Sequence, residues 1–230
     1  ISIGLGTTSN ITNVTATAQW QRVSFSIVAA SNPVFYINGN GASVLVWGCQ
    51  AESHYYGRLP LMSSYIPTTS TSQTRSATKA QNAGDSTMFS KNEGVLYFEG
   101  SAQEDAPTSR FISISPGATT NRAAIIFTST TNQIQGNYRQ GATTKAAITH
   151  TVSDITDNVK IAFKYKSGDF ALWVNGTEVA TSTATFTAHS DFTELSFDQG
   201  ADSGWFEGNV RCVATFKEAL TDTELQNLTS

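Results

Sequence analysis

Three segments in the last third of the chain decide the fold: FALWVNGT at residues 170–177, GADSGWFEGNV at 200–210 and ALTDTELQ at 219–226. The first alternates apolar and other side chains and runs into Asn175-Gly176, a pair that tolerates the positive φ of a tight hairpin turn. The second is a glycine-rich loop that leads into another apolar strand. In the third, Thr221 and Glu224 form the pattern of a capping box, which predicts a short helix over residues 221–228.

Composition favours an all-β protein. Apolar residues make up 39% of the 230 residues, enough for a core, whereas charged residues make up only 14%, below the roughly 25% usual for soluble domains. Thr, Ser, Asn, Ala and Gly fill the difference. Short polar side chains suit strand exteriors and tight turns and support helices poorly. A chain of this length holds one large β domain or two small ones.

Charge and hydropathy exclude several classes of protein. The formal charge of −4 comes from 18 acidic and 14 basic residues spread along the chain, and no basic block is present to meet phosphates. We therefore expect no nucleic-acid partner. No apolar run approaches the roughly 20 residues that span a bilayer, so we expect no membrane insertion. The chain opens at Ile1 and is expected to be part of something longer.

The two cysteines, Cys49 and Cys212, lie in different halves of the chain, each within an apolar strand pattern. Two readings stay open: a pair of buried free thiols, or a disulfide between the halves. Neither residue has a second Cys or a His at ligand spacing, so the pattern does not predict a zinc site.

The N-terminal segment predicts a small β structure. Residues 20–27 alternate with period two, residues 33–37 form a second apolar run, and residues 44–52 form a third whose apolar start predicts burial on both faces. So few strands make a poor sandwich by themselves. Residues 68–82 carry no large apolar side chain and read as a linker. We therefore predict a partial β-sandwich over residues 1–67 and a second domain over residues 83–230.

The second domain is predicted to be a sandwich. Turn residues recur at about the spacing expected of one, at 115–117, 167–169 and 175–176. The clear strand patterns lie at residues 94–100, 110–115, 123–127, 159–165, 170–179, 194–197 and 210–216.

Two resemblances give these domains a function. Residues 85–230, and above all their closing hairpin, loop, strand and helix, resemble laminin-G-like (concanavalin A-like) jelly-roll lectin domains. The N-terminal segment is similar to the final part of a carbohydrate-binding-module-like jelly roll that recurs in bacteriophage tail fibres and tailspikes. The matching residues there are Trp20, Gln21, Arg22, Trp47, Gly48, Gln50, Glu52 and 64–69 (SYIPTT).

Carbohydrate binding needs aromatic faces for the apolar side of a sugar ring and polar or planar groups for its hydroxyls. Trp173 is expected on the sheet face opposite its apolar neighbours, where it either meets ligand or is buried by another element. Trp205, within a glycine-rich loop, either contacts ligand or closes the sandwich edge. Tyr138-Arg139 is read as a turn after an Ile-rich strand, where Arg139 either clamps an acidic sugar or is simply solvated.

Acidic residues of the second domain are candidates for a calcium site or for catalysis. The lectin resemblance implies a calcium ion held by rim loops, for which Asp198 and Asp202 are the candidates, with Asp105 across the rim. Related jelly rolls also include glycanases, which set paired carboxylates on one strand. No such run occurs here, and the nearest acidic pairs are Glu104-Asp105 and Asp154 with Asp157. We predict no catalysis.

These inferences converge on the C-terminal, receptor-binding part of a phage tail fibre. Its sandwich would contact host polysaccharide or lipopolysaccharide, and the resemblance further implies a homotrimer located on the virion. Two other functions stay open: a polysaccharide depolymerase, and a purely structural sandwich module, for which both Trp173 and Trp205 would be fully buried.

Overall fold

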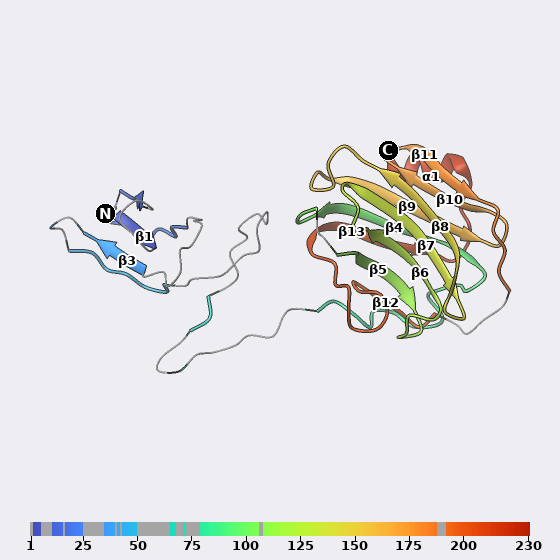
Figure 1. The fold of residues 1–230 in the computed structure, drawn as a ribbon, viewed down its shortest axis with the longest axis horizontal. Helices are drawn as coiled ribbons and strands as arrows, with labels where there is room; N and C mark the ends of the chain where they lie inside the picture. Colours follow the sequence, from blue (N-terminus) through green and yellow to red (C-terminus); the bar gives the residue numbers. More distant parts are fainter. Residues whose placement is uncertain are drawn as a thin grey trace. The chain divides into compact units, whose positions relative to one another are not determined.

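The fold is described from a computed structural model of the chain, which covers residues 2–5, 11–15, 17–24, 35–39, 41, 43–49, 65–67, 71, 79–105, 108–187 and 192–230. The chain divides into two compact units, Ile1–Ser76 and Ala77–Ser230, which are taken separately below (Figure 1). The division falls within the segment predicted as a linker, most of which lies outside the described residues.

The N-terminal unit contains a three-stranded antiparallel sheet. Its strands are β1 (Ser2–Leu5), β2 (Ile11–Asn13) and β3 (Phe35–Asn38), in the order β2-β1-β3. Strand β3 confirms the run predicted at residues 33–37.

Two other strand predictions in this unit are wrong where they can be examined. Residues 20–24 and 43–49 are described but belong to no strand. The apolar start of the run at residues 44–52 was expected to be buried on both faces, yet the Leu45 side chain is 85% exposed. Burial on both faces needs a covering layer on each side. The described part of this unit contains a single three-stranded sheet and no such layers.

The C-terminal unit is a sandwich of two five-stranded sheets, whose paired strands are all antiparallel (Figure 1). The first sheet has the order β11-β10-β9-β4-β13 and the second the order β12-β5-β6-β7-β8. The strands are β4 (Glu93–Ala102), β5 (Arg110–Ser115), β6 (Arg122–Phe127), β7 (Gln133–Gln140), β8 (Thr143–Thr151), β9 (Val159–Lys166), β10 (Phe170–Val174), β11 (Thr177–Ser182), β12 (Glu194–Ser196) and β13 (Gly208–Phe216).

All seven strand regions predicted here are confirmed, and two strands were missed. The hairpin turn between β10 and β11 has positive φ at both Asn175 (47°) and Gly176 (78°), as its sequence predicts. The missed strands, β7 and β8, form a second hairpin that completes the second sheet. Residues 138 and 139, read as a turn, therefore lie within strand β7.

Aromatic rings fill the space between the two sheets. The rings of Phe98, Phe127 and Phe206 form one group, with centroids 5.1–5.6 Å apart in each pair. Tyr138 and Tyr165 stack at 5.7 Å in another part of the same core. Their hydroxyls are satisfied, because buried phenol groups need acceptors: that of Tyr138 donates to the Lys91 carbonyl at 2.9 Å, and that of Tyr165 to the Ser90 carbonyl at 2.8 Å.

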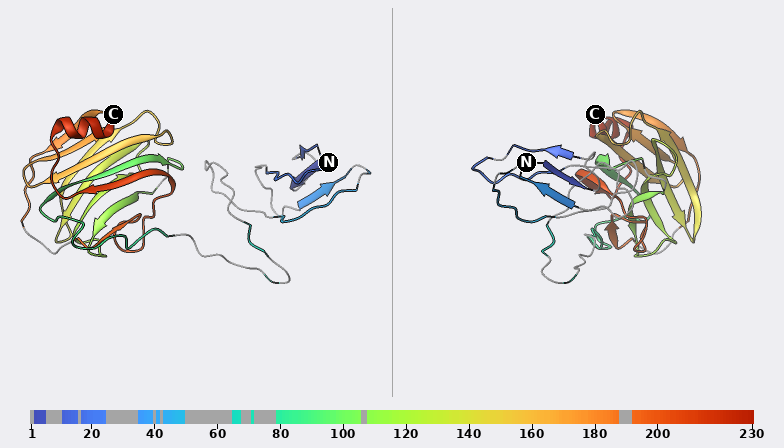
Figure 2. Two further views of the ribbon diagram at one scale, coloured as in Figure 1. Left: turned by 180° about the vertical axis from the view of Figure 1, so that it is seen from behind. Right: turned by 60° about the vertical axis from the view of Figure 1, so that its left-hand side comes forward.

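A helix covers the outer face of the first sheet. Helix α1 (Asp222–Thr229) contacts β9, β10 and β11 (Figure 2, left). The predicted capping box is present: the Thr221 hydroxyl accepts from the Glu224 amide, and the Glu224 carboxylate accepts from the Thr221 amide at 2.8 Å. Leu225, fully buried, packs with Trp173 and Tyr97 in a small core beneath the helix. Among the described residues, no helix is long and apolar enough to span a membrane.

Both cysteines are free, as the first of the two interpretations has it, but both are exposed, so the burial that it expected is wrong. Cys212 lies on β13, an edge strand of the first sheet, and Cys49 lies outside the N-terminal sheet. Neither position is covered by a second layer, which explains why an apolar sequence pattern did not bring burial.

Candidate functional site

Tyr138 cannot contact a surface ligand. Its side chain has no exposed area, and its ring packs between those of Tyr165 and Phe186, the latter at 4.4 Å. Strand β7 alternates, so Tyr138 faces the core while Asn137 and Arg139 face outward. The prediction of Tyr138 as a carbohydrate-binding residue is wrong, since it rested on a turn that is a strand.

Trp173 points away from the inter-sheet core, as its alternation predicts, but it does not reach solvent. Phe170, Leu172 and Val174 belong to the inter-sheet core, whereas Trp173 lies on the opposite face and is only 6% exposed. Helix α1 covers that face through Leu225. Of the two readings left open, burial by a neighbouring element is the one observed, and Trp173 is corrected from a ligand contact to a core residue.

Trp205 is half-buried in the loop between β12 and β13. The ammonium group of Lys79 lies 4.9 Å from the centroid of its ring, a cation–π contact, and forms an ion pair with Asp202 at 2.5 Å. The main chain at Trp205 bridges to Phe111 on β5. The residue is therefore held against the second sheet in a half-buried position, and its contact with a sugar stays a prediction.

The candidate calcium ligands do not fit a calcium site. Asp198 is buried, and its two carboxylate oxygens accept from the backbone amides of Gly200 and Asp202 at 2.7 and 2.8 Å. The carboxylate of Asp202 turns to Lys79 instead. Asp105, expected across the rim, accepts from the Asn132 amide. Calcium needs several converging oxygen ligands, and the described residues contain no cluster of three or more His, Cys, Asp or Glu side chains that could hold a metal.

Three of the four acidic residues in the candidate catalytic pairs, Glu104, Asp105 and Asp154, have structural partners. Glu104 forms an ion pair with the buried Arg110 at 3.2 Å. The Asp154 carboxylate accepts from the hydroxyl and the amide of Thr156, and these bonds lower the pKa of Asp154. A general acid in glycoside hydrolysis needs a raised pKa, so Asp154 is unsuited to that role.

Arg139 lies on the outer face of the second sheet. It stands on β7 directly opposite Arg122 on β6. Arg122 is almost fully buried and was not selected from the sequence, because nothing in the local pattern of residues 122–127 places it beside another arginine. Strand pairing brings the two together.

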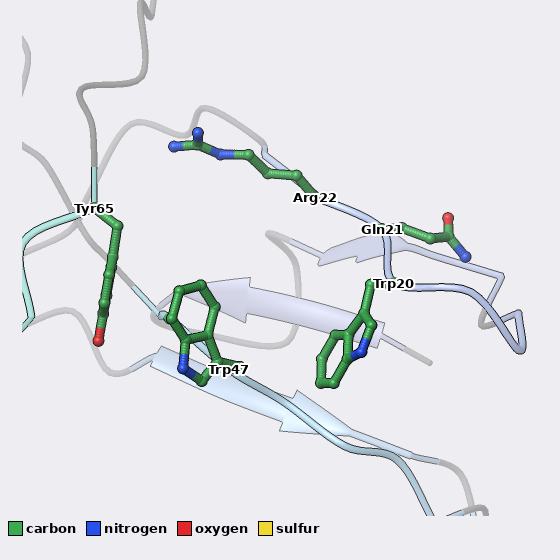
Figure 3. Close-up of a pocket in the computed structure, with 6 residues that line it drawn as sticks. Trp20, Gln21, Arg22, Trp47 and Tyr65 are labelled. Carbon is green, nitrogen blue, oxygen red and sulfur yellow. The ribbon is translucent and has the colours of Figure 1, made fainter.

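A pocket of about 470 Å³ lies in the N-terminal unit, lined by Trp20, Gln21, Arg22, Trp47, Gly48 and Tyr65. Trp20 and Trp47 are each 74% exposed. The rings of Trp47 and Tyr65 are 4.9 Å apart between centroids and inclined at 48°. Figure 3 shows Trp47 between the other two rings, with the Arg22 side chain extending toward the Tyr65 side.

Local contacts position this pocket. Gln21 donates through Nε2 to the Thr15 carbonyl at 3.0 Å and to the Thr17 hydroxyl at 2.8 Å, which ties down the segment that carries Trp20. Gly48 has a φ of +67°, a conformation that side chains rarely adopt, and this turn of the main chain follows Trp47 directly. The pocket residues were noted in the sequence for their resemblance to a phage module, but they were not predicted as a site.

The chemistry of the pocket suits a sugar. Exposed aromatic faces stack against the apolar side of a pyranose, while amide and guanidinium groups at the rim bond hydroxyls. No acidic residue lines the pocket, so its described lining offers binding groups and no carboxylate for acid–base chemistry.

Comparison with known proteins identifies the fold. No protein-family model and no curated protein sequence matches the chain. Among solved structures, the CBM40 domain of the IT-sialidase from Ruminococcus gnavus is 15% identical with a TM-score of 0.51, over 61% of this chain and 84% of that domain. A native heptameric SAP-like pentraxin from Limulus polyphemus is 10% identical with a TM-score of 0.53, over 66% of this chain and 75% of that one. The predicted fold class is confirmed: the chain contains an all-β, two-sheet sandwich with the concanavalin A-like fold.

Proposed function

We propose that this chain is a carbohydrate-binding, non-catalytic part of a bacteriophage tail fibre, which adheres to host polysaccharide or lipopolysaccharide. The observation that carries carbohydrate binding is the pocket of the N-terminal unit. Two tryptophan rings, each largely exposed, stand beside Tyr65 and Arg22 there. Large exposed aromatic side chains gathered at one place mark an interaction site.

Two further observations support the proposal. The sandwich of the C-terminal unit has the fold of a carbohydrate-binding module, CBM40, although a shared fold alone does not establish a shared ligand. The phage origin rests on the tail-fibre resemblance of residues 20–69. A location on the virion and assembly into a homotrimer are proposed on that resemblance alone.

The experiment is a binding assay of the purified full chain on a glycan array and on candidate host cells. Trp47→Ala is the test variant, because Trp47 lies between the other two rings of the pocket (Figure 3). Leu45→Ala is the matched control, since Leu45 is 85% exposed in the same segment but does not line the pocket. We expect Trp47→Ala to weaken binding about tenfold or more, as truncation of an anchoring Trp does, and Leu45→Ala to leave it unchanged.

Three outcomes would overturn the proposal. If the double variant Trp47→Ala/Trp20→Ala still binds glycan as the wild type does, the pocket is not the glycan-binding site. A folded wild-type chain that binds no glycan and no host surface would favour a structural module. Release of sugar fragments from host capsule during the assay would show a depolymerase instead.

A further inference from the structure

Arg122 and Arg139 form a pair of like charges on the outer face of the second sheet. They are register partners on β6 and β7. These two strands are neighbours in the second sheet (Figure 1). Residues directly opposite each other in antiparallel strands have Cβ atoms about 4.5–5.5 Å apart, and like charges there repel. In the described part of the chain, neither guanidinium forms an ion pair with a carboxylate.

The surroundings of Arg122 disfavour its positive charge. Its side chain is 5% exposed. Burial and, to a smaller extent, the charge of Arg139 together lower the pKa of Arg122 to about 10, and Asp198 only partly opposes them. A bound anion would offset both the burial and the repulsion, since it is attracted by each guanidinium.

Both arginines are fixed before any ligand arrives. Arg122 donates from Nη1 to the Gln199 carbonyl at 2.9 Å, and its guanidinium lies 4.8 Å from the centroid of the Phe111 ring. Arg139 donates from Nη2 to the Ala142 carbonyl at 2.5 Å. Ala142 itself has a φ of 64°, unusual for a residue with a side chain. Its amide donates to the Thr120 carbonyl at 2.9 Å, which holds this turn in place.

Hydrogen-bonding capacity is left unused at this position. The Nε atoms of Arg122 and Arg139 are buried and have no acceptor among the described residues. Asn137, which shares the outer face of β7 with Arg139, is 5% exposed, and its Oδ1 likewise has no donor among them. Its Nδ2 donates to Gln135 Oε1 at 3.2 Å, which orients the amide. Buried polar groups without partners are rare, and each one calls for an explanation such as a missing ligand.

We propose that Arg122, Asn137 and Arg139 bind a carboxylated sugar. The sugar carboxylate accepts hydrogen bonds from the guanidinium groups, and a ring hydroxyl donates to Asn137 Oδ1. A carboxylate matches the planar fork of a guanidinium, and a sugar hydroxyl supplies the donor for Asn137 Oδ1 that an anion without a hydroxyl group lacks. This inference rests on the proposed carbohydrate-binding function and adds the class of sugar, at a site in the other unit from the aromatic pocket.

The test is an NMR titration of the isotope-labelled full chain with three matched probes: D-glucuronate, D-glucose and glucose 6-phosphate. We expect glucuronate to shift the side-chain Nε–H signals of Arg122 and Arg139 in a saturable way, and glucose to leave them unchanged. Shifts from glucose 6-phosphate that equal or exceed those from glucuronate would overturn the choice of a carboxylate. Absence of any saturable shift with glucuronate would overturn the site.

Variants distinguish binding at this site from a general effect of the protein's net charge. Arg139→Gln should weaken glucuronate binding at least about tenfold, the effect of losing a charge-assisted hydrogen bond. Arg211→Gln removes the same charge from β13, in the other sheet, and should leave binding unchanged. Asn137→Ala should weaken glucuronate binding, because a ring hydroxyl loses its acceptor. Equal losses in Arg139→Gln and Arg211→Gln would reduce the effect to net charge and refute the site.

One variant distinguishes failure here from failure of the proposed function. Trp47→Ala leaves Arg122, Asn137 and Arg139 untouched, so the shifts that glucuronate causes in the Nε–H signals of the two arginines should persist. Suppose that Trp47→Ala abolishes binding of a neutral glycan, while glucuronate causes no shift in the arginine Nε–H signals of the wild type. That result would uphold the proposed function and reject this inference alone.

Discussion

Replacement of Tyr138 by Phe tests whether this residue serves the core or a ligand. The Tyr138 hydroxyl donates to the Lys91 carbonyl at 2.9 Å, and its side chain is fully buried. Removing one intramolecular hydrogen bond lowers the free energy of unfolding by about 1 kcal/mol in mutational series. The ring keeps its packing against Phe186 and Tyr165, so we expect no further loss from a cavity.

The assay pairs thermal unfolding with glycan binding on the same preparation. For a unit of this size, about 1 kcal/mol corresponds to a fall in Tm of about 2–4 °C. Tyr165→Phe is the matched control, because the Tyr165 hydroxyl makes an equivalent bond to the Ser90 carbonyl at 2.8 Å. We expect both variants to lose similar stability and to bind glycans as the wild type does. A Tyr138→Phe protein with wild-type Tm but weakened binding would refute the reasoning, since only a surface role for the hydroxyl would give that result.

Four shorter predictions follow from the same contacts. Burial raises the pKa of Tyr97 to about 12 and also raises that of Tyr165. Because the folded state favours the uncharged phenols, the free energy of unfolding should be highest below pH 10 and fall as pH rises through the folded pKa values. Urea unfolding at pH 9 and pH 11 will measure the difference. Backbone and side-chain hydrogen bonds in the capping box lower the pKa of Glu224 below 4.5. The stability that this carboxylate contributes is present above pH 4.5 and is lost as pH falls through the folded pKa. An NMR titration that gives the Glu224 carboxyl a pKa at or above 4.5 would contradict the capping box. Leu225→Ala should lower the free energy of unfolding by about 2–5 kcal/mol, the usual cost of truncating a buried leucine, whereas replacement of the exposed Gln226 by Ala should cost little by thermal unfolding. Removal of divalent cations by EDTA should leave glycan binding unchanged, because the Asp198 carboxylate is already satisfied by backbone amides; loss of binding in EDTA, restored by calcium, would reverse that conclusion.

The strands that could be predicted from sequence are those with a strong apolar face. The β10–β11 hairpin combined alternation with an Asn-Gly turn, and both signals agree in the structure. Strands β7 and β8 were missed because Gln, Asn, Thr and Lys occupy many of their positions, so only a few residues carry the apolar period. Their turn, at Gly141 and Ala142, requires positive φ at an alanine, for which sequence gives no cue.

The candidate sites were predicted less well, because a site depends on which strands become neighbours. Arg139 was selected for its chemistry and assigned to a turn. Its partner Arg122 lies 17 positions earlier and becomes adjacent only through the pairing of β6 with β7. Asn137 offered no signal at all until its burial was known. Individual residue types with suitable chemistry can be chosen from a sequence, but their convergence follows from sheet register.

Two correct local predictions together imply that the Trp173 ring is covered. Alternation placed its ring on the outer face of the first sheet, and the capping box predicted a terminal helix. An amphipathic helix must bury its apolar side against something, because that burial supplies most of its stability. Leu225 needed an apolar surface, and the outer face that Trp173 shares with Tyr97 offers one. Considered together, the helix and the strand predict that Trp173 is covered and that ligand-binding aromatic residues must be sought elsewhere, on a surface without such a partner. The exposed rings of Trp20 and Trp47 meet that condition in the described part of the chain, which is why the binding test above is directed at the pocket and not at Trp173.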